Sequence, residues 1–239
     1  MKNERSYILA VETSSRVGSI AVGCGAQVIA SKRFPSMARH GVELIPTVKR
    51  LLEENNICTN DIDVICVSGG PGSFTGLRVG FAFARALAQV VGARLVKVSS
   101  TDVIAENVKP ILSERAERCS IAVIIDAKRN QIFSAGFEWN GSKLTKMLED
   151  CVIFPDTLLK KLSAPILVLG EGLMFHRDIF DKKGVEILEE QYWRGDAENV
   201  YKLGLNEIRA ERFVEINDFV PNYIRLPEAE ERWLEKNKR

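Results

Sequence analysis

One order of expected secondary structure occurs twice along the chain. Alternating apolar residues predict strands, and apolar residues at helical spacing predict helices. The first half is expected to contain strands over 7–11, 18–23 and 27–34, a helix over 41–55, a strand over 64–67, a helix over 74–91, a strand over 94–98 and a short helix from Ser100 or Thr101. A fainter second copy has strands over 121–126, 131–139 and 143–152, a helix opening at Pro155, a strand over 166–169 and a helix over 197–212.

Three strands, a helix, a strand and a helix, repeated once, is the chain order of a duplicated ribonuclease H-like fold. This is the two-lobed α/β architecture of actin and the sugar kinases. The chain has 239 residues, of which 46% are hydrophobic, so it is long enough to build two lobes, each with its own core. We therefore expect an N-terminal lobe over residues 1–112 and a C-terminal lobe over 113–239.

The charge balance and the cysteines narrow the possible functions. Lys and Arg number 33 against 32 Asp and Glu, a formal net charge of +1, so the chain as a whole has no field that would hold a nucleic-acid backbone by itself. The five cysteines are scattered and never spaced as CxxC, which argues against a metal site. Cys24 and Cys66 lie in apolar runs and are expected to behave as small hydrophobic residues. Free thiols favour a reducing compartment.

The N-terminal apolar run over residues 7–11 is too short for the core of a signal peptide. No other segment reads as a membrane span. From the sequence we expect a cytoplasmic protein without membrane contact.

The densest local signal is the glycine-rich stretch over residues 68–78, which follows an expected strand and opens an expected helix. It lacks the Lys of a P-loop, the GxGxxG spacing of a dinucleotide site and the flanking glycines of a nucleophile elbow. Ser73 is interpreted as a helix cap. Two interpretations of the loop stay open: a tight turn, or an anion site at the helix N-terminus.

Small residues recur at every fourth position of the following helix, at Gly76, Gly80, Ala84 and Ala88. They form one smooth stripe, with Leu77 and Phe81 beside it. Each internal glycine costs about 1 kcal/mol of helix stability relative to alanine, so close approach of another backbone is the expected compensation. Whether that backbone is the chain's own sheet or a second protein cannot be read from the spacing.

The string over residues 70–78, GPGSFTGLR, resembles the signature of the tRNA threonylcarbamoyladenosine biosynthesis protein TsaB family, once called YeaZ. Four further segments are similar to the family in the same order. They are residues 8–14, His40 with residues 44–46, residues 125–128 and residues 221–225. The resemblance covers the whole chain, strongly to about residue 135 and thinly over 140–215.

The resemblance implies an actin-like fold and an accessory role in a complex. It implies a heterodimer with TsaD, the catalytic paralogue that transfers threonylcarbamoyl to N6 of the adenosine next to the tRNA anticodon, with TsaE joining and tRNA contacted through the complex. Pairing is expected through the helices over 41–55 and 74–91, and the chain alone is expected to form a homodimer through the same surface. The predicted partner-contacting residues are Leu44, Val48, Gly76, Leu77, Gly80, Phe81, Ala84 and Ala88.

Departures from the active members of the superfamily predict no catalytic residue, cofactor or metal. The first hairpin turn, from Glu12 to Arg16, contains no glycine to admit phosphate. His40 is followed four residues later by Leu44, where the paralogue has a second metal-binding histidine, and the other histidine is the distant His176. His40 is expected at a helix N-terminus near the surface. Glu12 and Asp126 are interpreted as structural hydrogen-bond acceptors.

Two alternatives remain. The chain could be an ATP-dependent small-molecule kinase or ATPase, in which Glu12 or Asp126 holds magnesium or acts as base. The glycines over 69–72 and 170–172 would then hold the nucleotide. A protease is a weaker alternative, because the sequence presents neither a metal site nor an activated nucleophile.

Overall fold

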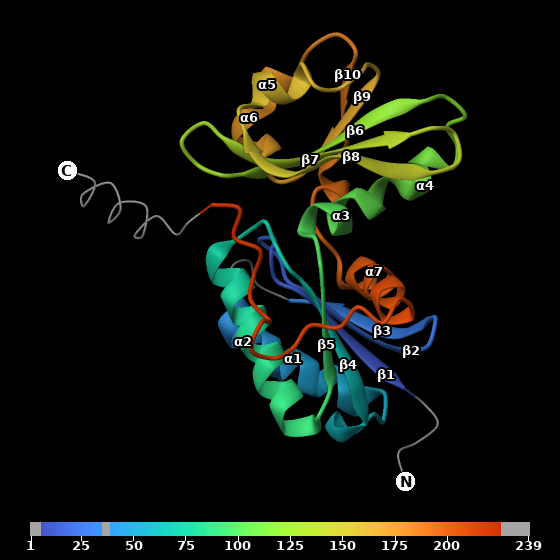
Figure 1. Ribbon diagram of the computed structural model, residues 1–239, viewed down its shortest axis with the longest axis vertical. Helices are drawn as coiled ribbons and strands as arrows, with labels where there is room; N and C mark the ends of the chain where they lie inside the picture. Colours follow the sequence, from blue (N-terminus) through green and yellow to red (C-terminus); the bar gives the residue numbers. More distant parts are fainter. Residues whose placement is uncertain (1–5, 35–38, 226–239) are drawn as a thin grey trace, which may run out of the picture.

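The computed structural model describes residues 6–34 and 39–225, which form two lobes, each built on one mixed β-sheet (Figure 1). The first sheet has the order β3-β2-β1-β4-β5. Its strands are β1 (Tyr7–Glu12), β2 (Ser19–Cys24), β3 (Gln27–Arg33), β4 (Ile62–Ser68) and β5 (Arg94–Val98). The first three strands are antiparallel, and β4 and β5 continue the sheet in parallel with β1.

The second sheet has the order β10-β9-β6-β7-β8. Its strands are β6 (Cys119–Asp126), β7 (Ile132–Trp139), β8 (Leu144–Ile153), β9 (Ile166–Leu169) and β10 (Val185–Ile187). In both sheets the first strand of the lobe pairs antiparallel with the second and parallel with the fourth. The shared order confirms the expected duplicated ribonuclease H-like, actin-like α/β fold.

Helices cover both faces of the first sheet (Figure 1). The alternation of side chains along β1 decides which of them meet which helix. Leu9 and Val11 pack with α1 (His40–Glu54) and α2 (Phe74–Val91) in one buried cluster. Ile8 and Ala10 face the opposite way, toward α7 (Ala197–Arg209). Since residues of a strand point alternately to its two faces, β1 is buried on both sides.

Shorter helices complete the second lobe and the connection between the lobes. They are α3 (Ser100–Ala105), α4 (Lys109–Leu112), α5 (Pro155–Leu159) and α6 (Leu173–Phe180). Three short 3₁₀ turns lie at Thr59–Asp61, Glu106–Val108 and Glu190–Tyr192. The elements not expected from the sequence are α4, α6, β10 and these turns.

The division of the chain into lobes differs from the prediction. Helix α7 lies within the range assigned to the C-terminal lobe, yet Val200 and Tyr201 pack on the first sheet with Val64, Cys66 and Val96. The chain then stays with the first lobe, where Val214 bridges Leu95 and Phe219 stacks on Phe81. The boundary at residue 112 is therefore wrong for this part of the chain, because one face of the first sheet needs α7 to cover its apolar residues.

Helix α2 also corrects the expectation about membrane spans. By length and composition alone, Phe74–Val91 is apolar enough to cross a membrane. Its buried residues pack into the core of the first lobe, which is how the core helix of a folded domain passes the same test.

Candidate docking surface and interlobe cleft

The small-residue stripe of α2 faces the chain's own sheet. A Cβ at Gly76 would collide with the main-chain oxygen of Thr13, and a Cβ at Gly80 with the Thr13 hydroxyl. Ala84 and Ala88 continue the stripe into the core. The two glycines therefore allow α2 to lie against the turn that follows β1, which is the close approach expected to compensate for their cost in the helix.

The residues predicted to contact a partner lie on the side of α1 and α2 that faces the chain's own sheet, not on the exposed side. All eight are buried inside the chain: Leu44, Val48, Gly76, Leu77, Gly80, Phe81, Ala84 and Ala88. These positions cover the first sheet and have no surface left for a second protein. The physical reason is that one face of the sheet depends on these two helices for its cover.

The opposite side of the same two helices is exposed and apolar. On α1, Val42 is 64% exposed and Ile45 is 63% exposed. A Cβ added at Gly41 of α1 would lie 3.8 Å from a methyl group of Val79 on α2. The two helices therefore lie side by side. Together they present one surface of exposed or half-buried apolar residues, which we name the α1/α2 face. It consists of Gly41, Val42, Ile45 and Pro46 of α1 and Val79, Ala82, Phe83 and Ala86 of α2.

The glycine-rich loop is held by bonds within the chain. The amide of Gly69 donates to Val98 O (2.7 Å), that of Gly70 to Ser100 Oγ (2.9 Å) and that of Ser73 to Ser14 O (2.8 Å). The Ser73 hydroxyl accepts from the Gly76 amide at 3.2 Å, which confirms it as the helix cap. Three amides of the loop are thus used within the chain, which supports the interpretation of the loop as a tight turn.

Glu12 ends β1 as a fully buried carboxyl group. Its Oε1 accepts from the Ser14 amide (2.5 Å), the Ser14 hydroxyl (2.6 Å) and the Ser15 amide (3.2 Å), whereas Oε2 has no partner. Burial raises the pKa of Glu12, and the hydrogen bonds from Ser14, Ser68 and Ser15 oppose this shift without cancelling it. Gly195 lies so close that a Cβ there would be 2.8 Å from Oε2, so the group is covered and, as expected, acts as a structural acceptor.

The raised pKa of Glu12 predicts a pH-dependent stability. The unfolded carboxyl loses its proton at its ordinary pKa while the folded one keeps it, so the free energy of unfolding falls as pH rises from that value to the folded pKa. Glu12→Gln cannot ionise, and we expect it to gain stability relative to the parent as pH goes from 5 to 8, measured by urea unfolding at each pH. A difference that stays constant over this range would contradict the assignment.

Asp126→Asn is the control for this experiment, because the pKa of Asp126 is shifted the other way. Burial raises it, but hydrogen bonds from the side chain and amide of Lys128 and the charge of Lys128 outweigh burial and hold the pKa below its usual value. The stability that this carboxylate contributes is lost only in acid, as pH falls through the depressed pKa. Because His176 Nε2 lies 3.6 Å from this carboxylate, the comparison is made in a His176→Gln background. In that background the variant should differ from its parent by a constant amount between pH 5 and 8.

His40 is the first residue of α1 and is buried, which corrects the expectation of a position near the surface. Its Nε2 lies 2.9 Å from Ser15 O and therefore carries the proton, while Nδ1 is buried without a partner. Burial lowers the pKa of His40, so the ring is neutral at neutral pH. In residues 6–34 and 39–225, no group of three or more His, Cys, Asp or Glu side chains is placed to hold a metal ion.

A cleft of about 520 Å³ lies between the lobes, where the kinase alternative would place a nucleotide. The acidic groups at its wall are engaged: Asp126 accepts from Lys128 N (3.0 Å) and Lys128 Nζ (2.7 Å), and Glu171 pairs with Arg194 (3.0 Å). The backbone of Gly172 is hydrogen-bonded to Ile124 O at 3.0 Å, so the glycines at 170–172 form a tight turn against β6.

Within the C-terminal segment over residues 221–225, residues 222–225 line this cleft, and the segment touches both lobes. Asn222 donates to Gly69 O (2.8 Å) and accepts from Lys97 Nζ (2.9 Å) on the first lobe. Arg225 donates to Ala127 O (2.7 Å) on the second. The segment that resembles the family's C-terminal motif therefore ties the lobes together across the cleft.

Among the cysteines, Cys66 agrees with the expectation for a buried residue. It is fully buried in the cluster under α7, and burial raises the pKa of its thiol beyond the reach of neutral pH. Cys24 is half-buried at the end of β2. Both lack a disulfide partner.

Comparison with known proteins places the chain in a family. The model "TsaD: tRNA N6-adenosine threonylcarbamoyltransferase" matches residues 28–233. The tRNA threonylcarbamoyladenosine biosynthesis protein TsaB of Bacillus subtilis is 31% identical, over 97% of this chain and 99% of the relative. TsaB of Escherichia coli is 22% identical, over 91% of this chain and 94% of the relative.

The fold is shared with a solved structure, YeaZ from Pseudomonas aeruginosa. Its TM-score is 0.76 at 22% identity, covering 91% of this chain and 99% of that one. The fold, the nearly complete coverage and the motif over 70–78 agree. The chain therefore belongs to the TsaB family of tRNA threonylcarbamoyladenosine biosynthesis proteins, within the wider group that the TsaD model describes.

Proposed function

We propose that the chain is a non-catalytic subunit of the complex that adds threonylcarbamoyl to tRNA. In this role it binds the threonylcarbamoyltransferase subunit TsaD as a heterodimer, TsaE joins the pair, and tRNA is engaged through the complex in the cytoplasm. Alone, the chain forms a homodimer. The observation that carries the proposal is the exposed α1/α2 face, which includes Val42 and Ile45.

The chemistry of this face fits a related subunit as its occupant. Contiguous exposed apolar residues on adjacent helices mark interaction sites. The chain matches the family model of the transferase itself, so the partner has a related fold and can present an equivalent helix pair. Two such pairs would then form a four-helix contact with pseudo-twofold symmetry, the arrangement that a homodimer of the chain would form with true symmetry.

The non-catalytic role is supported by the state of the cleft. The carboxylate of Asp126 is held by Lys128, and Glu171 by Arg194. Glu12 is buried under Gly195 with its pKa raised. Glu12 therefore lacks the exposure, and Asp126 and Glu171 lack the unengaged carboxylate, that magnesium-dependent phosphoryl transfer requires.

Reconstitution tests the proposal. Threonylcarbamoyl transfer from a supplied threonylcarbamoyl adenylate, which releases AMP, to a tRNA transcript is measured by mass spectrometry of its nucleosides. The reaction is run with this chain alone, with the TsaD and TsaE subunits of the same organism, and with all three. We expect no modified adenosine with the chain alone and at least a tenfold higher rate when it is added to the other two.

Modification by the chain alone, or an unchanged rate on its addition, would refute the accessory role. Calorimetry with ATP and magnesium addresses the kinase alternative on the same preparation. Micromolar binding of ATP that depends on magnesium and is lost in Asp126→Asn would favour it.

A further inference from the structure

A second cavity, of about 790 Å³, lies on the α7 side of the first lobe. It is bounded by α7, by the segment 106–110 and by the turn at Glu190–Tyr192. Its volume falls within the range of about 300–1,000 Å³ of small-molecule sites. We name it the α7 groove. The interlobe cleft described above shares none of its lining residues.

The α7 groove is cationic although the chain as a whole is nearly neutral. Its lining contains Arg33, Lys109, Lys202 and Arg209 against the single carboxylate of Glu106. Two of these cations are paired: Arg33 with Asp196 at 2.8 Å and Lys109 with Glu106 at 2.7 Å. Because a concave surface focuses the field of like charges, the groove attracts anions even though the formal net charge of the chain is +1.

The other two cations belong to one face of α7. Lys202, Asn206 and Arg209 are spaced at i, i+4 and i+7 and all line the groove. Among residues 6–34 and 39–225, Lys202 Nζ reaches only Asn199 Oδ1, at 3.5 Å. In the part of the chain that the structure describes, the guanidinium of Arg209 makes no ion pair or hydrogen bond.

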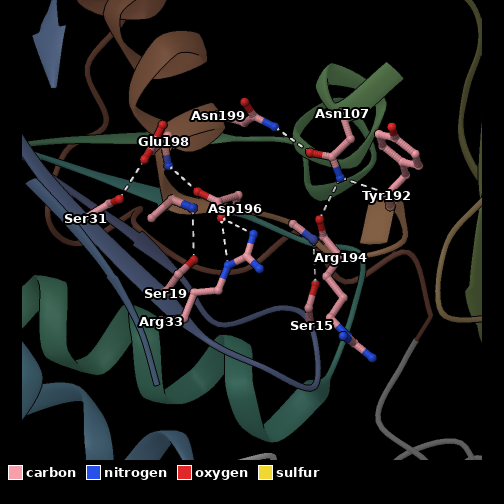
Figure 2. Close-up of polar contacts among 12 residues, drawn as sticks. Ser15, Ser19, Ser31, Arg33, Asn107, Tyr192, Arg194, Asp196, Glu198 and Asn199 are labelled. Atoms are coloured by element: carbon pink, nitrogen blue, oxygen red, sulfur yellow. Dashed lines mark hydrogen bonds and ion pairs between the residues drawn. The ribbon is translucent and has the colours of Figure 1, made fainter. Parts of the chain in front are cut away.

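The carboxylates that could neutralise this face along the helix point elsewhere. Glu198, one turn before Lys202, accepts from the Ser31 hydroxyl at 2.6 Å (Figure 2). Glu207 is bound by the guanidinium of Arg212 at 2.6 and 2.7 Å. An ordinary solvated helix face would pair its charges at i, i+4, whereas here both acids are engaged away from the groove.

Asn107 and Asn199, which line the groove, belong to one network of side-chain amide hydrogen bonds (Figure 2). The Asn107 amide group donates to Tyr192 O (2.8 Å) and Arg194 O (2.7 Å). Asn199 donates to Asn107 Oδ1 (2.8 Å) and Val103 O (3.2 Å). These bonds connect α7, the segment after α3 and the turn before α7, so the cationic face is positioned against a fixed wall.

The lining matches the chemistry of a nucleotide. Lys and Arg side chains bind phosphate oxygens. The Asn206 amide, which lines the groove, can donate and accept at a base edge, and Tyr192 with Leu203 offers an apolar surface for a base. Helix α7 and the α1/α2 face lie on opposite sides of the first sheet (Figure 1), so a partner on that face leaves the groove open.

We propose that the α7 groove binds a phosphate-bearing nucleotide, either free or as a unit of an RNA chain. The site does not require the pairing proposed above. It is tested on the isolated full-length chain, so its failure and the failure of the accessory role are separate results.

The test compares two double variants with equal change in charge. The variant Lys202→Glu with Arg209→Glu reverses the charge of two side chains in the groove. The control, Lys160→Glu with Lys183→Glu, makes the same change at exposed lysines of the second lobe. Binding of a fluorescein-labelled tRNA transcript is followed by anisotropy across a salt series, and binding of ATP by calorimetry. Thermal unfolding verifies that both variants remain folded.

We expect the groove variant to bind at least one probe about tenfold or more weakly than the parent, and the control less than threefold more weakly. For the transcript, the plot of log K against log salt should become less steep, its negative slope shrinking in magnitude by about 1.5, because two phosphate contacts are lost. If the groove variant loses binding of the transcript alone, the ligand is a nucleotide within RNA. If it loses binding of ATP alone, the ligand is a free nucleotide. No binding of either probe by the parent, unchanged binding by the groove variant, or equal losses in both variants would each overturn the proposal.

Discussion

A chain that carries Val42→Glu and Ile45→Glu will bind the TsaD subunit about 1,000-fold more weakly than the parent. Both side chains belong to the α1/α2 face and are well over half exposed, so the substitutions leave the core of the lobe intact. In the complex they would bury two carboxylates in an apolar contact without partners, and hot-spot losses of this kind amount to about 2 kcal/mol or more each. The dissociation constant is measured by biolayer interferometry with immobilised TsaD.

Met147→Glu is the matched control, because Met147 is exposed by 64%, as Val42 is, but lies on β8 of the other lobe. It should bind TsaD as the parent does. The double variant Val42→Glu with Ile45→Glu should sediment as a monomer at concentrations where the parent is a dimer. If TsaD binds the double variant and the parent equally, the α1/α2 face is not the docking surface.

Gly76→Ala will lower the free energy of unfolding by about 3 kcal/mol. The added methyl group would collide with the main-chain oxygen of Thr13 and would press on the ring of His40 at 3.1 Å. Neither can move freely, because Thr13 continues β1 and His40 is bonded to Ser15. Overpacking of this kind typically costs about 1–3 kcal/mol, and collision with main chain belongs at the upper end. Urea unfolding at 25 °C measures the loss.

Gly41→Ala is the control for Gly76→Ala, because it makes the same chemical change on the neighbouring helix. Only a methyl group of Val79, at 3.8 Å, comes near an added Cβ there, so the substitution should stabilise the chain by up to about 1 kcal/mol through helix propensity. Equal effects of the two substitutions would show that the close approach of α2 to Thr13 does not matter for stability.

The order and approximate bounds of most elements could be predicted from periodicity alone. The helices expected over 41–55 and 74–91 are observed as α1 and α2, and the weaker strand expected over 143–152 is observed as β8. Strand β10 and helix α6 were missed because three and eight residues carry too little periodic signal beside the turn residues that flank them.

The face that each helix presents could not be predicted. Both sides of α1 carry apolar residues, and Val42 and Ile45 fit a helical stripe about as well as Leu44 and Val48, which are the pair that the fold buries. The glycine stripe of α2 correctly indicated a close approach. Whether the approaching backbone belonged to the chain itself was decided only by the position of Thr13, which helical spacing does not contain.

The polar sites depended on tertiary contacts in the same way. The α7 groove was missed because Arg33, Lys109 and Arg209 are far apart in the sequence and meet only when α7 crosses to the first lobe. One signal for it was present, the i, i+4, i+7 spacing of Lys202, Asn206 and Arg209, but this spacing is also common on solvated helices.

The return of α7 to the first sheet has a consequence for synthesis of the chain. All five strands of that sheet leave the ribosome long before residue 197, yet the apolar layer formed by Ile8, Ala10, Val64 and Val96 stays open to water until α7 has been made. Contacts that distant in sequence form late. The first-made half of the molecule is therefore completed last, and a chain interrupted anywhere in the second lobe would expose an uncovered sheet to aggregation and proteolysis.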